Sequence, residues 1–131
     1  MKCMANKRVV ETSNAPQNDN PYSQGILTEG LLFVSGQGPT DPSTGEEVRG
    51  GIEAQTDQTL ANLQTIIESA GGSLNDVVKV SLYLADISDY DTVNTMYGQY
   101  FDHDPPARVC VEVARLPGDI NIEIEAFASI E

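Results

Sequence analysis

The sequence predicts an α+β fold, with a mixed sheet of about six strands and two helices on one face of that sheet. Short segments in which apolar and polar residues alternate are typical of strands with one buried face. Two longer segments carry apolar residues at helical spacing. A chain of 131 residues with 40% hydrophobic content can bury one core, so we expect a single domain over residues 1–131. Within it, residues 1–5 are expected to be disordered or to precede an alternative start at Met4.

The first part of the chain predicts three strands, a tight turn and two loops. Glu29-Gly30 separates two strand-like runs, and such a pair favours a two-residue hairpin turn. Residues 13–21 are rich in proline and asparagine, and residues 36–51 are rich in glycine, so both segments are expected to be loops. The expected strands are Lys7–Thr12, Gln24–Thr28 and Leu31–Gly36.

Two helices are predicted from one-sided apolar spacing. The first ends at Gly71-Gly72, a pair typical of a helix C-terminus. The second begins at Ser88, which forms a capping box with Asp91, and it ends at the residues Asp102–Pro106. The apolar stripes comprise Thr56, Leu60, Leu63, Ile67 and Ala70 in the first helix, and Tyr90, Val93, Tyr97, Tyr100 and Phe101 in the second.

Three more strands are predicted after the first helix, at Val77–Ala85, Arg108–Val113 and Ile122–Ala128. The turn Leu116–Ile120 suggests that the last two strands form a hairpin. The faces rich in valine and isoleucine, with Val78 among them, are expected to pack against the helices. The opposite face then presents Ser81, Tyr83, Arg108, Cys110, Glu123 and Phe127. Because this mixture is too apolar for a solvated surface, we expect several chains to associate there, with a pocket near the subunit boundary.

Twenty acidic residues against seven basic residues give a net charge of −13. Nucleic acids and anionic membranes are attracted by basic clusters, so neither is expected as a partner. The apolar runs are too short to span a bilayer, and residues 1–8 lack the apolar segment of a secretory signal, so we expect a cytoplasmic protein. The acidic surplus fits adaptation to a high-salt cytosol or an ordinary acidic protein, and both interpretations stay open.

Arg108 is the leading candidate for substrate binding. It follows two prolines and opens a strand, so its backbone is stiffly placed, and a guanidinium held in this way can bind a carboxylate with two hydrogen bonds. The alternative is an ion pair with Glu112 or Glu125. Glu123 shares a strand face with Glu125 and could act as a general acid or base near a bound anion. For Glu125 itself, an ion pair or a solvated edge is the favoured interpretation.

Other chemically capable residues carry weaker predictions. Cys110 lies two residues from Arg108 and is expected to be a small, half-buried residue rather than a nucleophile. His103 is expected in an exposed polar turn. Asn94 lies off the apolar stripe of the second helix, either on the surface or facing a pocket. Two cysteines and one histidine cannot build a zinc site, so no metal is expected.

The most specific sequence segments are Asn14-Ala15-Pro16, Pro21-Tyr22-Ser23-Gln24, Val34-Ser35-Gly36-Gln37, Val93-Asn94 with Tyr97, and PPARVCVEVARLPGDINIEIEA from Pro105. Together they resemble the RidA/YjgF family of imine deaminases, and the resemblance runs from about Val9 to Ser129. It implies a chorismate-mutase-like α+β fold and a homotrimer with sites between subunits. It also implies hydrolysis of reactive 2-imino and enamine acids (2-aminoacrylate/2-iminopropanoate and 2-iminobutanoate) to 2-oxo acids and ammonia, without cofactor or metal.

The resemblance also implies a role for individual residues. Arg108 matches the residue that binds the substrate carboxylate, and Glu123 matches the glutamate that holds or activates the attacking water. The residues that match pocket-lining positions are Tyr22, Ser35, Gly36, Asn94 and Cys110. The chain departs from the family pattern in the short linker Asp102–Pro105 and in Gly38, which replaces a branched apolar residue. Both departures are expected to affect the substrate size that the site accepts.

Two other functions remain as alternatives. A trimer could bind 2-oxo acids or related metabolites without catalysis and act as a sensor or holdase. The presence of Arg108 favours the enzyme over this alternative. A ribonuclease or inhibitor of translation is disfavoured, because the acidic charge would repel RNA.

Overall fold

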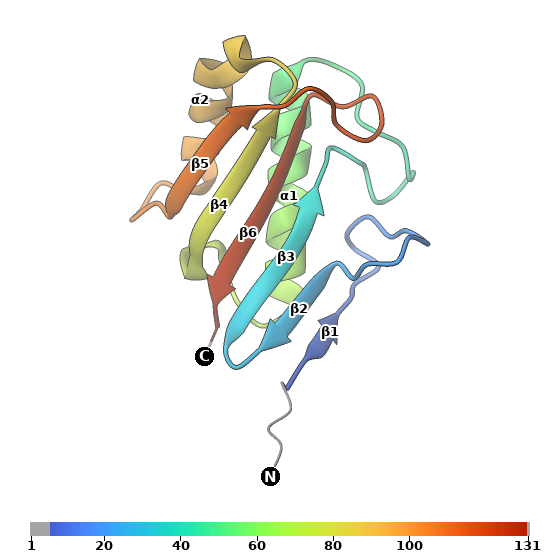
Figure 1. Cartoon of the computed structure of the whole chain (residues 1–131), viewed down its shortest axis with the longest axis vertical. Helices are drawn as coiled ribbons and strands as arrows, with labels where there is room; N and C mark the ends of the chain where they lie inside the picture. The colour runs from blue at the N-terminus through green and yellow to red at the C-terminus, as the bar shows by residue number, and fades with distance from the viewer. Residues whose placement is uncertain (1–5, 131) are drawn as a thin grey trace.

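The computed structural model describes residues 6–130, and Figure 1 shows one sheet with two α-helices behind it. Two short 3-10 turns, η1 (Leu74–Asp76) and η2 (Ile87–Asp89), precede β4 and α2 respectively. The expectations for residues 1–5 lie outside the described residues. The main elements are β1 (Arg8–Val10), β2 (Gly25–Thr28), β3 (Leu31–Gln37), α1 (Ile52–Ser69), β4 (Val77–Leu84), α2 (Tyr90–Tyr100), β5 (Ala107–Glu112) and β6 (Ile122–Ser129).

The six-stranded sheet has the order β1-β2-β3-β6-β4-β5. Strands β1, β2 and β3 form an antiparallel meander, and β6 pairs antiparallel with both β3 and β4. Strand β5 lies at the far edge, parallel to β4. The helices α1 and α2 make the β3-to-β4 and β4-to-β5 crossovers, and both cover the same face. The predicted fold class, a mixed six-stranded sheet with two helices on one face, is confirmed.

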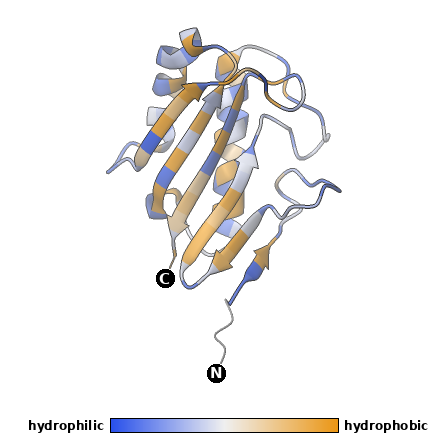
Figure 2. Cartoon of the chain, viewed as in Figure 1, coloured by the Kyte–Doolittle hydropathy of each residue, from blue (hydrophilic) through white to orange (hydrophobic). Residues whose placement is uncertain are grey.

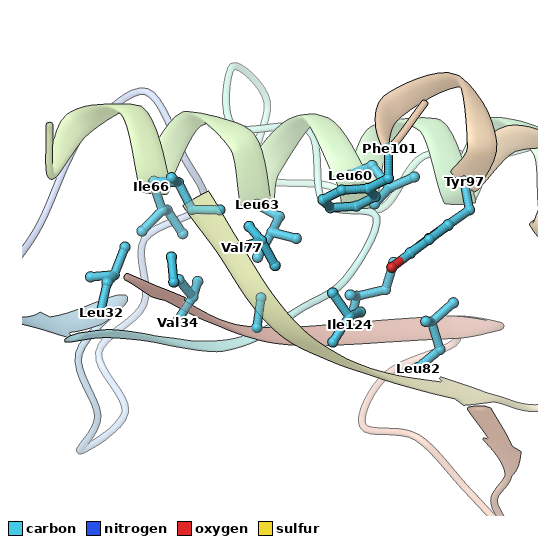
Figure 3. Close-up of a cluster of buried hydrophobic side chains, with 14 of the residues drawn as sticks. Leu32, Val34, Leu60, Leu63, Ile66, Val77, Leu82, Tyr97, Phe101 and Ile124 are labelled. Carbon is cyan, nitrogen blue, oxygen red and sulfur yellow. The ribbon is translucent and has the colours of Figure 1, made fainter. Parts of the chain in front are cut away.

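The core lies between α1 and the central strands. Figure 3 shows Leu60, Leu63 and Ile66 of α1 pointing at the sheet, where Val34 and Ile124 meet them. The predicted stripe of α1 is therefore the buried one. A Gly71 φ of +94° and the hydrogen bond from Gly72 N to the Ile67 carbonyl end the helix as expected. Among the described residues, no helix is long and apolar enough to cross a membrane.

The Leu63→Ala substitution is expected to lower the free energy of unfolding by about 2–5 kcal/mol, because Leu63 is fully buried and its loss leaves a cavity beneath α1. Urea denaturation at fixed protein concentration measures this change. Gln64→Ala on the same helix, whose side chain contacts Glu68 at the surface, should change stability by less than about 0.5 kcal/mol. A Leu63→Ala protein as stable as the Gln64→Ala protein would contradict this account of the core.

The turn between β2 and β3 is as expected. Glu29 and Gly30 have φ values of 49° and 79°, and Thr28 pairs directly with Leu31. Positive φ at both central residues is the mark of the type I′ turn, whose twist matches that of the two strands.

The predicted hairpin between the last two strands is wrong. β5 and β6 are not neighbours, because β4 lies between them and pairs with both. The segment around Leu116–Ile120 therefore passes over the end of β4. The turn residues are compatible with a β5–β6 hairpin and also with a connection that crosses the end of β4. Only the long-range pairing of β4 with both strands decides between the two.

The predicted capping box at the second helix is also wrong. Asp86, rather than Ser88, is the capping residue, since its Oδ1 accepts hydrogen bonds from Ser88 N (2.9 Å) and Ser88 Oγ (2.7 Å). This cap begins η2, and α2 follows from Tyr90. A capping box occurs instead at Ser73 and Asp76 of η1.

The predicted alternation of buried and exposed side chains in β4 is wrong at the first residues of the strand. The register shifts between Val77 and Lys79, so that Val77 is buried whereas Val78 is 49% exposed. From Val80 onward the strand alternates as expected, with Val80, Leu82 and Leu84 on the helix face.

The expected orientation of β5 is reversed. Arg108 pairs with Val80 and Cys110 pairs with Leu82, so both side chains lie on the helix face. Val109 and Val111 lie on the opposite face, which no helix covers, and are 44% and 41% exposed. We call this uncovered side the open face. As predicted, its residues on β4 and β6 include Lys79, Ser81, Tyr83, Glu123, Glu125 and Phe127. The alternation of β5 was correct, but its helix face meets Tyr90, Asn94 and Tyr97 of α2, which contact Arg108.

Candidate active site

The seven predicted site residues fall into two groups on the two sides of the sheet. Arg108, Asn94 and Cys110 lie on the helix face, and with Tyr90 and Tyr97 we call them the arginine cluster. Glu123, Ser35, Gly36 and Tyr22 line a hollow on the open face, which we call the glutamate hollow. Within one chain the two groups face opposite ways, so the prediction that Arg108 and Glu123 share a face is wrong.

In the arginine cluster, α2 holds the guanidinium of Arg108 in place. Arg108 Nη2 donates to Asn94 Oδ1 at 2.7 Å and to Tyr90 Oη at 3.0 Å. The guanidinium carbon lies 4.8 Å from the centre of the Tyr97 ring and 5.5 Å from that of Tyr90. These aromatic and amide contacts fix the position of the charge without neutralising it.

Arg108 has no acidic partner within residues 6–130, where His103–Asp104 is the one ion pair. The expected alternatives are both engaged elsewhere. Glu112 Oε1 accepts from Ile87 N, and Glu125 accepts from Tyr83 on the open face. No described lysine or arginine forms an ion pair, so what distinguishes Arg108 is that Asn94, Tyr90 and Tyr97 hold its guanidinium in place. Its remaining N–H groups suit a carboxylate that comes from outside the chain.

The glutamate hollow forms where β3 bulges. Ser35 and Gly36 together face the single residue Glu125 of β6, because the register shifts between Val34 and Gln37. The hollow measures about 540 Å³. Ser35 is anchored by its Oγ, which donates to the Ser23 carbonyl at 2.5 Å.

Gly36 determines where the Glu123 carboxylate sits. A Cβ at position 36 would overlap that carboxylate, so only glycine allows it to lie against the backbone of β3. Burial, and then the negative charge of Glu125, raise the pKa of Glu123. Glu123 therefore keeps a proton to higher pH than an ordinary glutamate, a property that suits proton transfer.

Cys110 is half-buried and packs against the core, beside Arg108 on β5. Burial raises the pKa of its thiol, although the positive charge of Arg108 acts in the opposite direction. The thiol therefore stays protonated at neutral pH and is a poor nucleophile. Histidine is a residue type that can activate a nucleophile, but the side chain of His103 is 81% exposed and lies in a polar turn, as expected.

We expect Cys110→Ala to retain kcat/KM within about threefold of the unaltered protein, since the thiol touches the site without taking part in bond formation. The rate of substrate loss at fixed enzyme concentration measures this. A loss of about 100-fold or more, in a variant with unchanged thermal stability, would assign the thiol a chemical role.

Two tyrosines of the arginine cluster were missed. Tyr90 and Tyr97 were assigned to the apolar stripe of the second helix, yet both contact Arg108. Their spacing with Asn94, four and three residues apart, places all three on one helical face, and this signal was available in the sequence. The contact between Tyr83 and Glu125 on the open face had no such signal, because it depends on the pairing of β4 with β6.

A family model described as Endoribonuclease L-PSP matches residues 12–130. The chain belongs to this family. It is the RidA/YjgF family, so the resemblance is confirmed.

Among RidA/YjgF relatives, a RutC family protein from Pyrococcus horikoshii is 53% identical over 122 residues, which are 93% of this chain and 97% of that protein. The human protein named 2-iminobutanoate/2-iminopropanoate deaminase is 44% identical over 122 residues, 93% of this chain and 89% of that protein. A crystal structure of a Rid family protein from Yersinia pestis, of unknown function, matches with a TM-score of 0.93 at 41% identity and covers 95% of this chain and 99% of that one. The chain thus matches these RidA/YjgF proteins over nearly their whole length.

One of the departures from the RidA/YjgF pattern lies in the site itself. Gly38 lines the glutamate hollow together with Ile120, and a Cβ at position 38 would lie 3.1 Å from Ile120 Cδ1. The other departure, Asp102–Pro105, is exposed and leads into β5 just before Arg108.

Proposed function

We propose that this protein is a deaminase that hydrolyses 2-imino and enamine acids to 2-oxo acids and ammonia. The supporting observation is the fixed guanidinium of Arg108, which α2 positions and no carboxylate of the described residues neutralises. The deaminase name of the human relative, at 44% identity, points the same way. The substrates in view are 2-aminoacrylate/2-iminopropanoate and 2-iminobutanoate, each of which carries a carboxylate next to the reacting carbon.

The reaction requires one group that binds the substrate carboxylate and one group that transfers protons. Arg108 binds the substrate carboxylate and so orients the adjacent C=N bond. Glu123 accepts a proton from water as the water oxygen attacks the imine carbon. The Glu123 carboxyl passes this proton to the nitrogen, which gives a carbinolamine. The carboxylate then takes the hydroxyl proton and passes it to the amino nitrogen, so that the carbon–nitrogen bond breaks, ammonia leaves and the carbon–oxygen double bond of the 2-oxo acid forms. Because an imine carbon is already electrophilic, this route needs neither a covalent nucleophile nor a cofactor.

We further propose that the site forms between two copies of the chain, within a homotrimer. Arg108 and Glu123 face opposite sides of the sheet, so one chain cannot bring both to one substrate. Figure 2 shows apolar residues along β2, β3 and β5, and some of these side chains are exposed on the open face. Phe33 and Phe127 pack there in a tilted arrangement with ring centres 5.1 Å apart, and Val109 and Val111 are more than 40% exposed. A second copy would cover these residues and bring its Arg108 towards Glu123.

Generating the imine in situ tests the proposed activity. An amino-acid oxidase converts an amino acid to its 2-imino acid, whose loss is followed with and without this protein, at low and at high KCl. The proposal expects faster imine loss and faster appearance of the 2-oxo acid when the protein is present. Equal rates would contradict it, and equal rates together with measurable 2-oxo acid binding would identify a non-enzymatic binder.

The family description names an endoribonuclease, but the charge of this chain disfavours RNA as a substrate. A net charge of −13 repels a phosphate backbone, and binding to nucleic acid depends mainly on basic side chains. We therefore do not propose an RNA-directed activity.

A further inference from the structure

The glutamate hollow contains a hydrogen bond that the proposed mechanism leaves unused. Tyr83 Oη donates to Glu125 Oε2 at 2.5 Å. Tyr83 pairs with Glu123 across β4 and β6, and Ser81 pairs with Glu125, so the phenol reaches diagonally to the next carboxylate along β6. Glu123 and Glu125 are two residues apart on one strand and line the same hollow.

We infer that Tyr83 and Glu125 are a positioning pair that controls the protonation of Glu123. The inference rests on the proposed function for its catalytic meaning, since Glu123 is the proton carrier there. Neither residue needs to touch the substrate. Glu125 acts through its charge, and Tyr83 acts by holding Glu125 in place.

Glu123 and Glu125 have different surroundings, so each carboxylate can have a separate role. Two carboxylates side by side would compete for one proton unless their surroundings distinguish them. Only Glu125 receives the phenol, and only Glu123 lies against the backbone at Gly36. The bond to Glu125 is also the largest cause that raises the pKa of Tyr83, so the phenol remains a donor throughout the range in which a glutamate titrates.

The other charged or titratable groups at this hollow are few. Tyr22 and Glu47 line it from the loops beside β2 and β3. Lys79 of β4 lies on the same face but pairs with Phe127, on the far side of Glu125 from Glu123. Arg108 is on the opposite face of the sheet. Glu125 is thus the charge that most directly affects Glu123, in agreement with its part in raising the pKa of Glu123.

The test measures the titration of Glu123 directly, by the ¹³C chemical shift of its side-chain carboxyl. Glu125→Gln removes the neighbouring charge, so the Glu123 midpoint should move to lower pH. Tyr83→Phe removes the hydrogen bond that holds Glu125, so Glu125 can turn away from Glu123 and the midpoint should move in the same direction by a smaller amount. In Tyr83→Phe/Glu125→Gln the midpoint should equal that of Glu125→Gln alone, because Tyr83 acts only through Glu125.

Glu68→Gln is the matched control, because it changes the net charge equally on the exposed surface of α1 and should leave Glu123 unmoved. An unchanged midpoint in Glu125→Gln overturns the inference. So does a Tyr83→Phe shift that adds in full to that of Glu125→Gln.

Kinetics separate this inference from the proposed function. If the imine assay succeeds, kcat should fall by about 3- to 10-fold in Glu125→Gln with KM changed by less than about twofold, and the acidic limb of the pH profile should follow the Glu123 midpoint. If the midpoint shifts as expected but the unaltered protein does not accelerate imine loss, the pair is established and the deaminase proposal fails. If imine loss is accelerated but the midpoint does not move, only the pair is refuted.

Discussion

Arg108→Ala is expected to lower kcat/KM for 2-iminopropanoate by about 100-fold or more, because the substrate loses the group that binds and orients its carboxylate. Arg108→Lys should recover part of this loss, because lysine keeps the positive charge but cannot form the same pair of hydrogen bonds to a carboxylate. Imine loss after in situ generation measures both variants.

Arg8→Ala is the matched control for this prediction. Arg8 is an exposed arginine of β1, distant in the sheet order from β5, and its replacement changes the net charge equally. We expect its kcat/KM to stay within about twofold of the unaltered protein. An Arg108→Ala protein that is folded and as active as Arg8→Ala would refute the anchor role.

Glu123→Gln is expected to lower kcat by about 10²–10⁴-fold, the usual contribution of a general acid or base, while KM changes little. The amide keeps the shape of the side chain beside Gly36 but cannot accept the proton of the attacking water. Glu68→Gln on the surface of α1 controls for the loss of one charge. A Glu123→Gln variant within about threefold of that control would remove Glu123 from the mechanism.

The pH profile provides a second readout of Glu123. Its pKa is raised above the ordinary value of 4.5, first by burial and then by the charge of Glu125. A base with a raised pKa loses its deprotonated form at higher pH as the solution is acidified. The acidic limb of kcat/KM should therefore lie at higher pH than an ordinary glutamate would place it, and the limb should disappear in Glu123→Gln.

Local patterns predicted the elements of this fold well. The spacing of Leu60, Leu63 and Ile67 located α1 and its buried face, and Glu29-Gly30 located the turn between β2 and β3. Strand order was not available locally, because β6 inserts between β3 and β4 through pairings that span most of the chain. The hairpin at Leu116–Ile120 was predicted wrongly for this reason.

The arrangement of the candidate site residues was not predictable from the sequence. The alternation in β5 places Arg108 and Val109 on opposite faces of the sheet, but it does not determine which of them faces the helices. The valines were assigned to the core because of their hydrophobicity. However, β5 is an edge strand, and Asn94 and Tyr97 of α2 contact Arg108 on its helix face. This reversal changes the account of function, since it places Arg108 and Glu123 on opposite faces of one chain.

The central claim is that Arg108 of one copy and Glu123 of another complete each site. Mixing two inactive variants tests it most directly. Arg108→Ala and Glu123→Gln chains are co-expressed with different tags, the mixed oligomers are purified through both tags, and imine loss is measured beside each variant alone.

A mixed trimer contains one interface at which the intact Arg108 and the intact Glu123 meet, so about a third of the activity of the unaltered protein should return. Mixed oligomers as inactive as the two parent variants would contradict the claim that the site is shared between copies.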